Sequence, residues 1–231
     1  MEEKRQIVSS LKESLLEETI DIGNEFLEIP IDQLIDNDML RDIPIVNTLV
    51  GLGKIAMNVR DLYLIKKTVA FIASLNQNKL SKEKIARHKA KLETDSKKLN
   101  KELEFIMVML DRMNETQKSI IMSNMYLKYL DEKTDFDWED FGILTDILER
   151  FSIYDCPTLL EVYDKGFIGI EDEFNKLGFS RLNSLGLIDY FGGMRMSLQS
   201  GENFIARINP LGQFFVENGL TDLNGSLLKF V

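Results

Sequence analysis

The chain has 231 residues, of which 44% are hydrophobic and 29% charged, and this composition is typical of a globular protein with a buried core. A single cysteine rules out an internal disulfide, and a single histidine leaves almost no room for a zinc site built from histidine and cysteine. The acidic, amphipathic N-terminus lacks the features of a secretory signal, and no run of about 18 uncharged apolar residues is present, so we expect a cytoplasmic protein without a membrane-spanning helix.

The N-terminal region predicts a helix over residues 3–28, which Pro30 ends or bends. The prediction rests on four apolar residues that recur at helical spacing among many glutamates: Ile7, Leu11, Leu15 and Ile22. A second, short helix is expected over residues 31–40.

Two apolar helices follow, and we expect them to form a hairpin. Pro44 suits the first turn of one helix. Gly51 and Gly53 would either weaken this helix or let another helix approach it closely. The second helix is expected over residues 62–75, the most apolar helical stretch of the chain.

The central part of the chain predicts helices over residues 81–112, 115–130, 136–151 and about 157–163. The first of them contains no proline or glycine. Its apolar stripe is expected in the core and consists of Leu99, Leu103, Ile106, Met107 and Leu110. The helix over 136–151 carries a similar stripe, formed by Phe141, Leu144, Ile147 and Leu148.

The last part of the chain changes character. A helix is predicted over 171–185, and the period-2 alternation of Met194–Leu198 and Phe204–Ile208 predicts a β-hairpin. Asn209-Pro210-Leu-Gly is expected to start a final helix, which covers Gln213–Asn218. A helix before a hairpin, and a helix after it, is the order of a winged-helix module. We therefore expect a mainly α protein, with a helical domain over 1–165 and a winged-helix-like α+β module over 166–231.

The charge is distributed unevenly along the chain. Residues 1–42 have a net charge of −8, residues 43–101 of +9, and residues 102–231 of −11, which together make the −10 of the whole chain. The basic segment also contains the apolar hairpin. Basic residues beside apolar helices suit an anionic lipid surface or a protein partner, so the segment is a candidate contact surface. Eight of its thirteen cations are the candidate contacts: Lys54, Arg60, Lys66, Lys67, Lys79, Lys82, Lys84 and Arg87.

The alternative is that the acidic flanks of the same protein cover this segment, because apolar runs of 10 to 14 residues are more often buried core helices. Under the first interpretation the protein contacts a partner protein, a second copy of itself, or the inner membrane as a peripheral protein. Under the second, the apolar hairpin is ordinary interior.

Three candidate sites fail on their spacing, and we expect neither enzymatic activity nor a cofactor. Gly51-Leu-Gly53-Lys54 lacks the distal glycine and the following hydroxyl of a phosphate-binding loop. The acidic residues between Asp135 and Asp140 lack the glycine position of a calcium loop and suit a helix N-terminus instead. Cys156 has no histidine nearby in sequence, so it is expected to be buried, and His88 to be exposed.

Nucleic-acid binding by the C-terminal module is the weaker alternative and stays open. Its candidate contacts are Lys176, Arg181, Arg195 and Arg207. The module helix opens with acidic residues, and the net charge around these cations is strongly negative, whereas phosphate contacts dominate affinity for nucleic acid.

The segment Asp38–Lys54, with its “IPIVNTLVGLGK” core, and Asn58–Lys67 are similar to a set of uncharacterised bacterial helical proteins. The resemblance continues through residues 110–133 and covers roughly 38–160. The tail “RLNSLGLIDY…RINPLGQFFVENG” resembles the ends of abortive-infection alpha-type phage-defence proteins. The matching residues belong to the core, so the resemblance implies no active site. It implies a bacterial or prophage origin and a role in phage defence, so we expect a defence or effector protein. A winged-helix transcriptional regulator is the alternative, which the order of the C-terminal elements leaves open.

Overall fold

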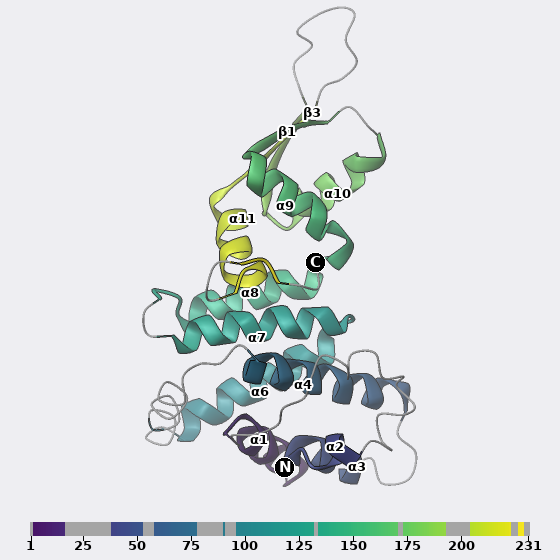
Figure 1. The fold of residues 1–231 in the computed structure, drawn as a ribbon, viewed down its shortest axis with the longest axis vertical. Coiled ribbons are helices and arrows are strands. Elements are labelled where there is room, and N and C mark those ends of the chain that lie inside the picture. Colours follow the sequence, from purple (N-terminus) through teal and green to yellow (C-terminus); the bar gives the residue numbers. More distant parts are fainter. Residues whose placement is uncertain are drawn as a thin grey trace, which may run out of the picture. The chain divides into compact units, whose positions relative to one another are not determined.

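The computed structural model describes residues 2–16, 38–52, 58–77, 90, 96–131, 134–170, 173–192, 204–222 and 226–228 (Figure 1). The chain divides into two compact units, Met1–Trp138 and Glu139–Val231. This division falls before the 165/166 boundary expected from the sequence, because α9 (Cys156–Lys165) contacts the strands of the C-terminal sheet. The expectation of a mainly helical protein with a small antiparallel sheet near its C-terminus is confirmed.

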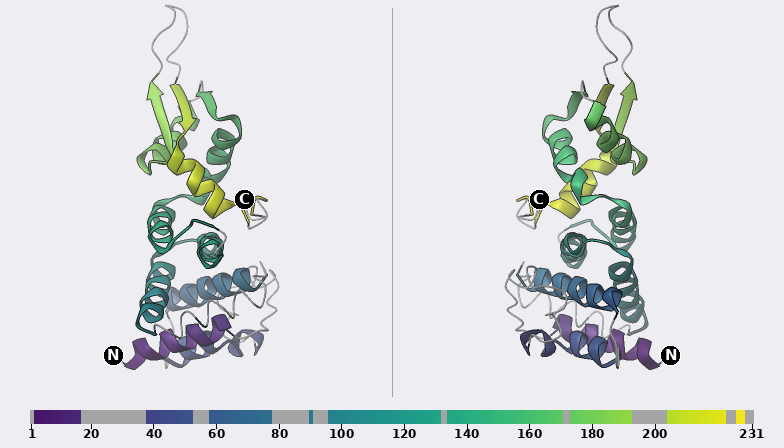
Figure 2. Two further views of the ribbon diagram at one scale, coloured as in Figure 1. Left: turned by 90° about the vertical axis from the view of Figure 1, so that its left-hand side faces the viewer. Right: turned by 90° about the vertical axis from the view of Figure 1, so that its right-hand side faces the viewer.

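The described helices of the first unit are α1 (Glu2–Leu16), α2 (Asp38–Arg41), α3 (Pro44–Leu52), α4 (Val59–Gln77), α6 (Ser96–Arg112) and α7 (Thr116–Leu130). Figures 1 and 2 show α4 between the α1–α3 pair and α7, and α4 contacts both α3 and α7. The expected stripe of α6 is buried, from Leu99 to Leu110. Because α7 is buried from Lys118 to Lys128, apart from Ile120, it is the central helix of this unit.

The α1–α3 pair is held by short polar side chains as well as by apolar packing. The Oγ atoms of Ser10 and Thr48 lie 2.5 Å apart, and Ser14 Oγ accepts a hydrogen bond of 2.9 Å from the backbone N–H of Ile45. Ser14 thereby satisfies an N–H in the first turn of α3, which has no partner within its own helix. The close helix approach expected at Gly51 is wrong: a Cβ there would meet no atom within 4 Å. Gly53 lies outside the described residues.

The second unit contains α8 (Trp138–Arg150, all but its first residue), the 3₁₀ turn η3 (Ile153–Asp155), α9, β1 (Phe167–Ile170), α10 (Glu173–Ser184), β2 (Ile188–Gly192), β3 (Phe204–Ile208), α11 (Pro210–Phe215) and the π-helical turn η4 (Val216–Leu220). The strands form one antiparallel sheet in the order β1-β3-β2. Helices α9 and α10 contact this sheet, and the rings of Phe151 and Phe215 lie 5.2 Å apart in the core.

The hairpin differs from the prediction in one strand. Phe204–Ile208 is a strand, as expected, but its described partner is Ile188–Gly192, whereas Met194–Leu198 lies outside the described residues. The chain enters β2 directly from Gly186, which has a φ of +74° and ends α10. Tyr190 and Phe191 therefore belong to the sheet, and β1 pairs on the other side of β3.

The final helix starts at Pro210 with Asn209 as its N-cap, which agrees with the start predicted at Asn209-Pro210-Leu-Gly. The Asn209 side chain accepts a hydrogen bond of 2.9 Å from the N–H of Gly212 and donates one of the same length to the carbonyl of Gly186. This double role ties the start of α11 to the turn before β2. Proline at the first helical position also suits this start.

Candidate interaction surfaces

The apolar hairpin expected at residues 43–75 is largely interior. Its buried residues include Ile43, Ile45 and Val46 around the start of α3, and the continuous stretch 67–75 of α4. These described residues belong to the core of the first unit, because α4 packs between α3 and α7, and so they do not form the apolar contact surface that we expected from the sequence. Five candidate cations of the segment lie outside the described residues: Lys54, Lys79, Lys82, Lys84 and Arg87.

Lys67 is a structural residue rather than a surface cation. Its side chain is 4% exposed, and its ammonium donates hydrogen bonds to the carbonyls of Asp111 (3.2 Å) and Met113 (2.7 Å). These carbonyls lie at the end of α6, where helix carbonyls lack partners within the helix. Burial lowers the pKa of Lys67, while the nearby Asp111 carboxylate opposes this shift. Lys67 thus caps α6 and is not available to a membrane or partner.

The described part of the segment keeps a small exposed patch at the start of α4. Val59, Arg60 and Tyr63 are exposed, and Lys66 is half-buried one turn further on. Arg60 binds the Asp111 carboxylate through two N–H groups of its guanidinium, so this cation is already paired with an anion of the same unit. No helix in the described part of the chain is long and apolar enough to cross a membrane.

The candidate nucleic-acid contacts do not form one described surface. Arg195 and the side chain of Lys176 lie outside the described part. Arg181 binds the buried carboxylate of Asp155 through two N–H groups, at 2.8 and 2.5 Å, and so fastens α10 to the start of α9. This contact raises the pKa of Arg181. Arg207 is exposed on β3.

A cavity of about 220 Å³ lies beside this ion pair, lined by Arg150, Ser152, Asp155, Arg181, Ser184 and Leu185. Two arginines suggest an anion site, but Arg150 lies in the last turn of α8 and Arg181 in the last turn of α10. Cations at these positions offset the negative ends of the helix dipoles. We therefore assign the two arginines to helix termini and to Asp155, and not to an external anion.

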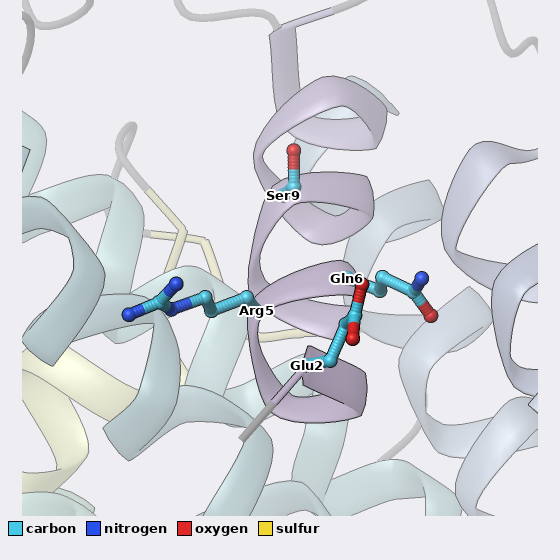
Figure 3. Close-up of a pocket in the computed structure, with 4 residues that line it drawn as sticks. All are labelled: Glu2, Arg5, Gln6 and Ser9. Carbon is cyan, nitrogen blue, oxygen red and sulfur yellow. The ribbon is translucent and has the colours of Figure 1, made fainter.

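A second cavity, of about 540 Å³, lies against the outer face of α1 (Figure 3). Its described lining residues are Glu2, Arg5, Gln6 and Ser9. Figure 3 shows Arg5 extending to one side of the helix and Gln6 to the other. Because these polar groups do not converge on one point, they make no binding site.

The C-terminal sheet presents an exposed apolar face, which the sequence did not identify. Phe167 of β1, Phe191 of β2 and Ile205 of β3 are 65%, 57% and 44% exposed. The strand register pairs Phe191 with Ile205, and it pairs Phe167 with Arg207, two residues further along β3. All three apolar side chains therefore share one face, since residues opposite each other, and residues two apart, point to the same side. We call this surface the open sheet face.

The opposite side of the sheet is the packed side. Ile188, Ala206 and Ile208 point to it and are buried, and α9 and α10 contact the strands. The alternation in Phe204–Ile208 signals that the strand has two different faces. It could not show which face α9 and α10 cover, because both faces carry apolar residues.

Glu102 of α6 is a buried carboxylate among aromatic residues of the first unit. Its side chain is 1% exposed, and its Oε1 accepts a hydrogen bond of 2.9 Å from the Tyr129 hydroxyl. Its Oε2 has no hydrogen-bond partner among the described residues. Burial raises the pKa of Glu102, although the Tyr129 hydrogen bond and Lys98 act in the opposite direction.

The raised pKa of Glu102 predicts a defined pH dependence of stability. In the pH range between the usual pKa of 4.5 and its raised value, the folded protein binds more protons than the unfolded chain, so the free energy of unfolding falls as pH rises through this range. We expect Glu102→Gln to remove this slope. The difference in free energy of unfolding between the variant and the wild type should therefore shift in favour of the variant from pH 4 to neutral pH. Urea unfolding at a series of pH values measures it.

Glu104→Gln is the matched control, because Glu104 is a half-buried carboxylate of the same helix. It should leave the slope in place. If Glu102→Gln unfolds along the same pH profile as the wild type, the account of Glu102 is wrong.

The remaining candidate groups do not form a reactive site in the described part of the chain. Cys156 is buried, as expected, and burial, followed by the charge of Asp155, raises the pKa of its thiol to about 12. A thiol with such a pKa is a weak nucleophile at neutral pH. Glu139 and Asp140 lie in the first turn of α8, as their helix-terminus role predicts. No group of three metal-binding side chains occurs among the described residues, and His88 lies outside them.

Comparison with known proteins adds no family. No protein-family model, no curated protein and no solved structure matches this chain.

Proposed function

We propose that the protein is a non-enzymatic defence or effector protein of bacterial or prophage type, which acts by contacting another protein through the open sheet face. The defence role follows from the resemblance of the tail to abortive-infection alpha-type proteins. The contact surface rests on the structure. Of the two surfaces considered, the open sheet face has stronger support than segment 43–101, because the apolar residues described in that segment are largely core.

The observation that carries the proposal is the exposure of Phe167, Phe191 and Ile205 together on one side of a three-stranded sheet. Single exposed apolar residues are common, but neighbouring ones that form a patch mark interaction surfaces. Aromatic residues are enriched in such surfaces. Arg207 and Asp189 flank the apolar residues on the same face, and would supply a polar rim.

The test is a phage-challenge assay in a bacterial host that expresses the full chain. We expect expression to lower the number of plaques, and Phe191→Asp to abolish this protection, because a carboxylate would stay hydrated on the open sheet face and oppose its burial. Tyr154→Asp is the control, since Tyr154 is an exposed aromatic residue of the same unit outside the sheet. Equal protection by both variants would contradict the proposal.

A winged-helix regulator that binds nucleic acid is the second candidate, and the topology favours it. Helix α10 directly precedes the β2–β3 pair, and α11 follows it. One observation does not favour it: Arg181, a candidate nucleic-acid contact, is already bound to Asp155. The described part of the chain between β1 and β2 contains one helix, α10. A mobility-shift assay on pooled genomic fragments at low salt decides the matter: a shift that Arg207→Ala weakens would favour this candidate over protein contact.

A further inference from the structure

We propose that the partner of the open sheet face is a second copy of this chain, which stacks its own open sheet face on it in a two-fold dimer. This inference rests on the proposed function and names its partner. It is drawn from the pattern of charged and apolar residues on the face, which is complementary to itself.

The face contains two rows across the strands. In one row, Phe167 of β1, Arg207 of β3 and Asp189 of β2 lie side by side. In the next row, Ile205 of β3 lies beside Phe191 of β2. On strands β3 and β2, one row therefore holds a cation next to an anion, and the other row holds two large apolar side chains.

A two-fold axis that runs parallel to the strands, between β2 and β3, places β2 of each copy over β3 of the other. Arg207 then lies opposite Asp189 of the second copy, and Phe191 lies opposite Ile205 of the second copy. Both contacts occur twice, as an isologous interface requires. Two sheets stacked in this way lie about 10 Å apart, a spacing that side chains of these sizes fill.

Other stacking arrangements are less favourable. An axis along β3 itself would place Arg207 opposite Arg207 of the second copy. An axis across the strands would place the charged row over the apolar row, so that both charges would be buried without an opposite charge from the second copy, which is costly. The charges thus select one arrangement, since specificity comes from repulsion in the alternatives as much as from attraction.

The size of the face predicts a weak dimer. Two of its strands have five residues and one has four, and with strands about 4.8 Å apart and about 3.3 Å per residue the face covers a few hundred Å². Stable interfaces bury about 800 Å² on each partner. We therefore expect reversible dimerisation at high micromolar concentration.

The experiment is sedimentation equilibrium of the full chain from about 10 μM to about 1 mM, a range that brackets such an affinity. The average mass of the wild type should rise from 26.6 kDa towards twice that value. Arg207→Asp alone and Asp189→Arg alone should each place like charges opposite each other and weaken association by about tenfold or more. An equimolar mixture of the two variants should associate again, because each mixed pair restores both opposite-charge contacts.

The mixing step separates contacts between copies from contacts within one sheet, because Arg207 and Asp189 are also neighbours in the same copy. Arg150→Asp is the control: it makes the same charge change at an exposed position of α8 and should leave association unchanged. Since Asp189 also accepts a hydrogen bond from Asn209, Phe191→Asp and Ile205→Lys form a second pair that should associate only when mixed.

The proposal is overturned if the wild type keeps a mass of 26.6 kDa throughout, if the single variants associate as the wild type does, or if neither mixture associates more than its components. The proposed function can fail separately. If the protein is monomeric and its phage protection still depends on Phe191, a second copy is ruled out as the partner. Contact with another protein through the open sheet face then remains.

Discussion

Replacement of Gly212 by alanine is expected to destabilise the second unit by more than about 3 kcal/mol, since a Cβ cannot be placed there without displacing backbone. An ideal Cβ at this position would overlap the carbonyl oxygen of Leu187 and lie 2.7 Å from Cδ1 of Ile208. The oxygen belongs to the backbone just before β2, so no side-chain rotation relieves the overlap. The start of α11 would have to move away from the sheet.

The same movement would break the Asn209 cap, because its side chain holds the Gly212 N–H and the Gly186 carbonyl together. Hydrogen exchange of the full chain would measure the effect, with protection lost in residues 139–231. Gly142→Ala is the matched control: it lies within α8, a Cβ there meets nothing within 4 Å, and the change should stabilise the helix by about 0.5–1 kcal/mol. Equal protection in both variants would show that the contact with Leu187 tolerates a methyl group.

Replacement of Lys67 by methionine is expected to lower the free energy of unfolding by about 2–3 kcal/mol. Methionine fills much of the same volume but donates no hydrogen bond, so the carbonyls of Asp111 and Met113 lose the ammonium that binds them. At least one of these hydrogen bonds is fully buried. A buried carbonyl without a donor loses its hydration and gains nothing in return.

Lys66→Met is the control for this variant, because it removes the same charge at the preceding position of α4, where the side chain is half-buried. Changes at such positions usually stay within about 0.5–1 kcal/mol. Chemical denaturation of both variants, monitored through Trp138 of the same unit, compares them. A loss of stability in Lys66→Met as large as in Lys67→Met would show that charge, and not the capping of α6, is what matters.

These two residues also show where sequence-based inference stopped. Lys67 follows Lys66 directly, and both were grouped with six other cations as a contact surface. The acceptors of Lys67 are 44 and 46 residues further along the chain, at the end of another helix. Nothing in the local pattern of α4 distinguishes a lysine that faces solvent from one that reaches such carbonyls.

The glycines likewise differ in a way that the local sequence does not show. Gly51 was expected to allow close packing and has open space around it, whereas Gly212 permits the closest backbone approach among the glycines of the described residues. The signal for Gly212 lay in the motif Asn209-Pro210-Leu211-Gly212, which marks a helix start. That motif carries no information on the Leu187 backbone, which is brought there by the turn at Gly186 and by strand pairing.

The sequence by itself determined the helices and their buried sides, because apolar spacing at 3.6 residues per turn is a local property. The described helices α6 to α9 lie within or close to their predicted ranges, and the stripes Leu99–Leu110 and Phe141–Leu148 are buried. The tertiary structure alone decided which apolar residues face outward. The apolar residues around Ile45 and along 67–75 are covered and the face around Phe191 is open, and this depends on which elements, far apart in sequence, pack against each side.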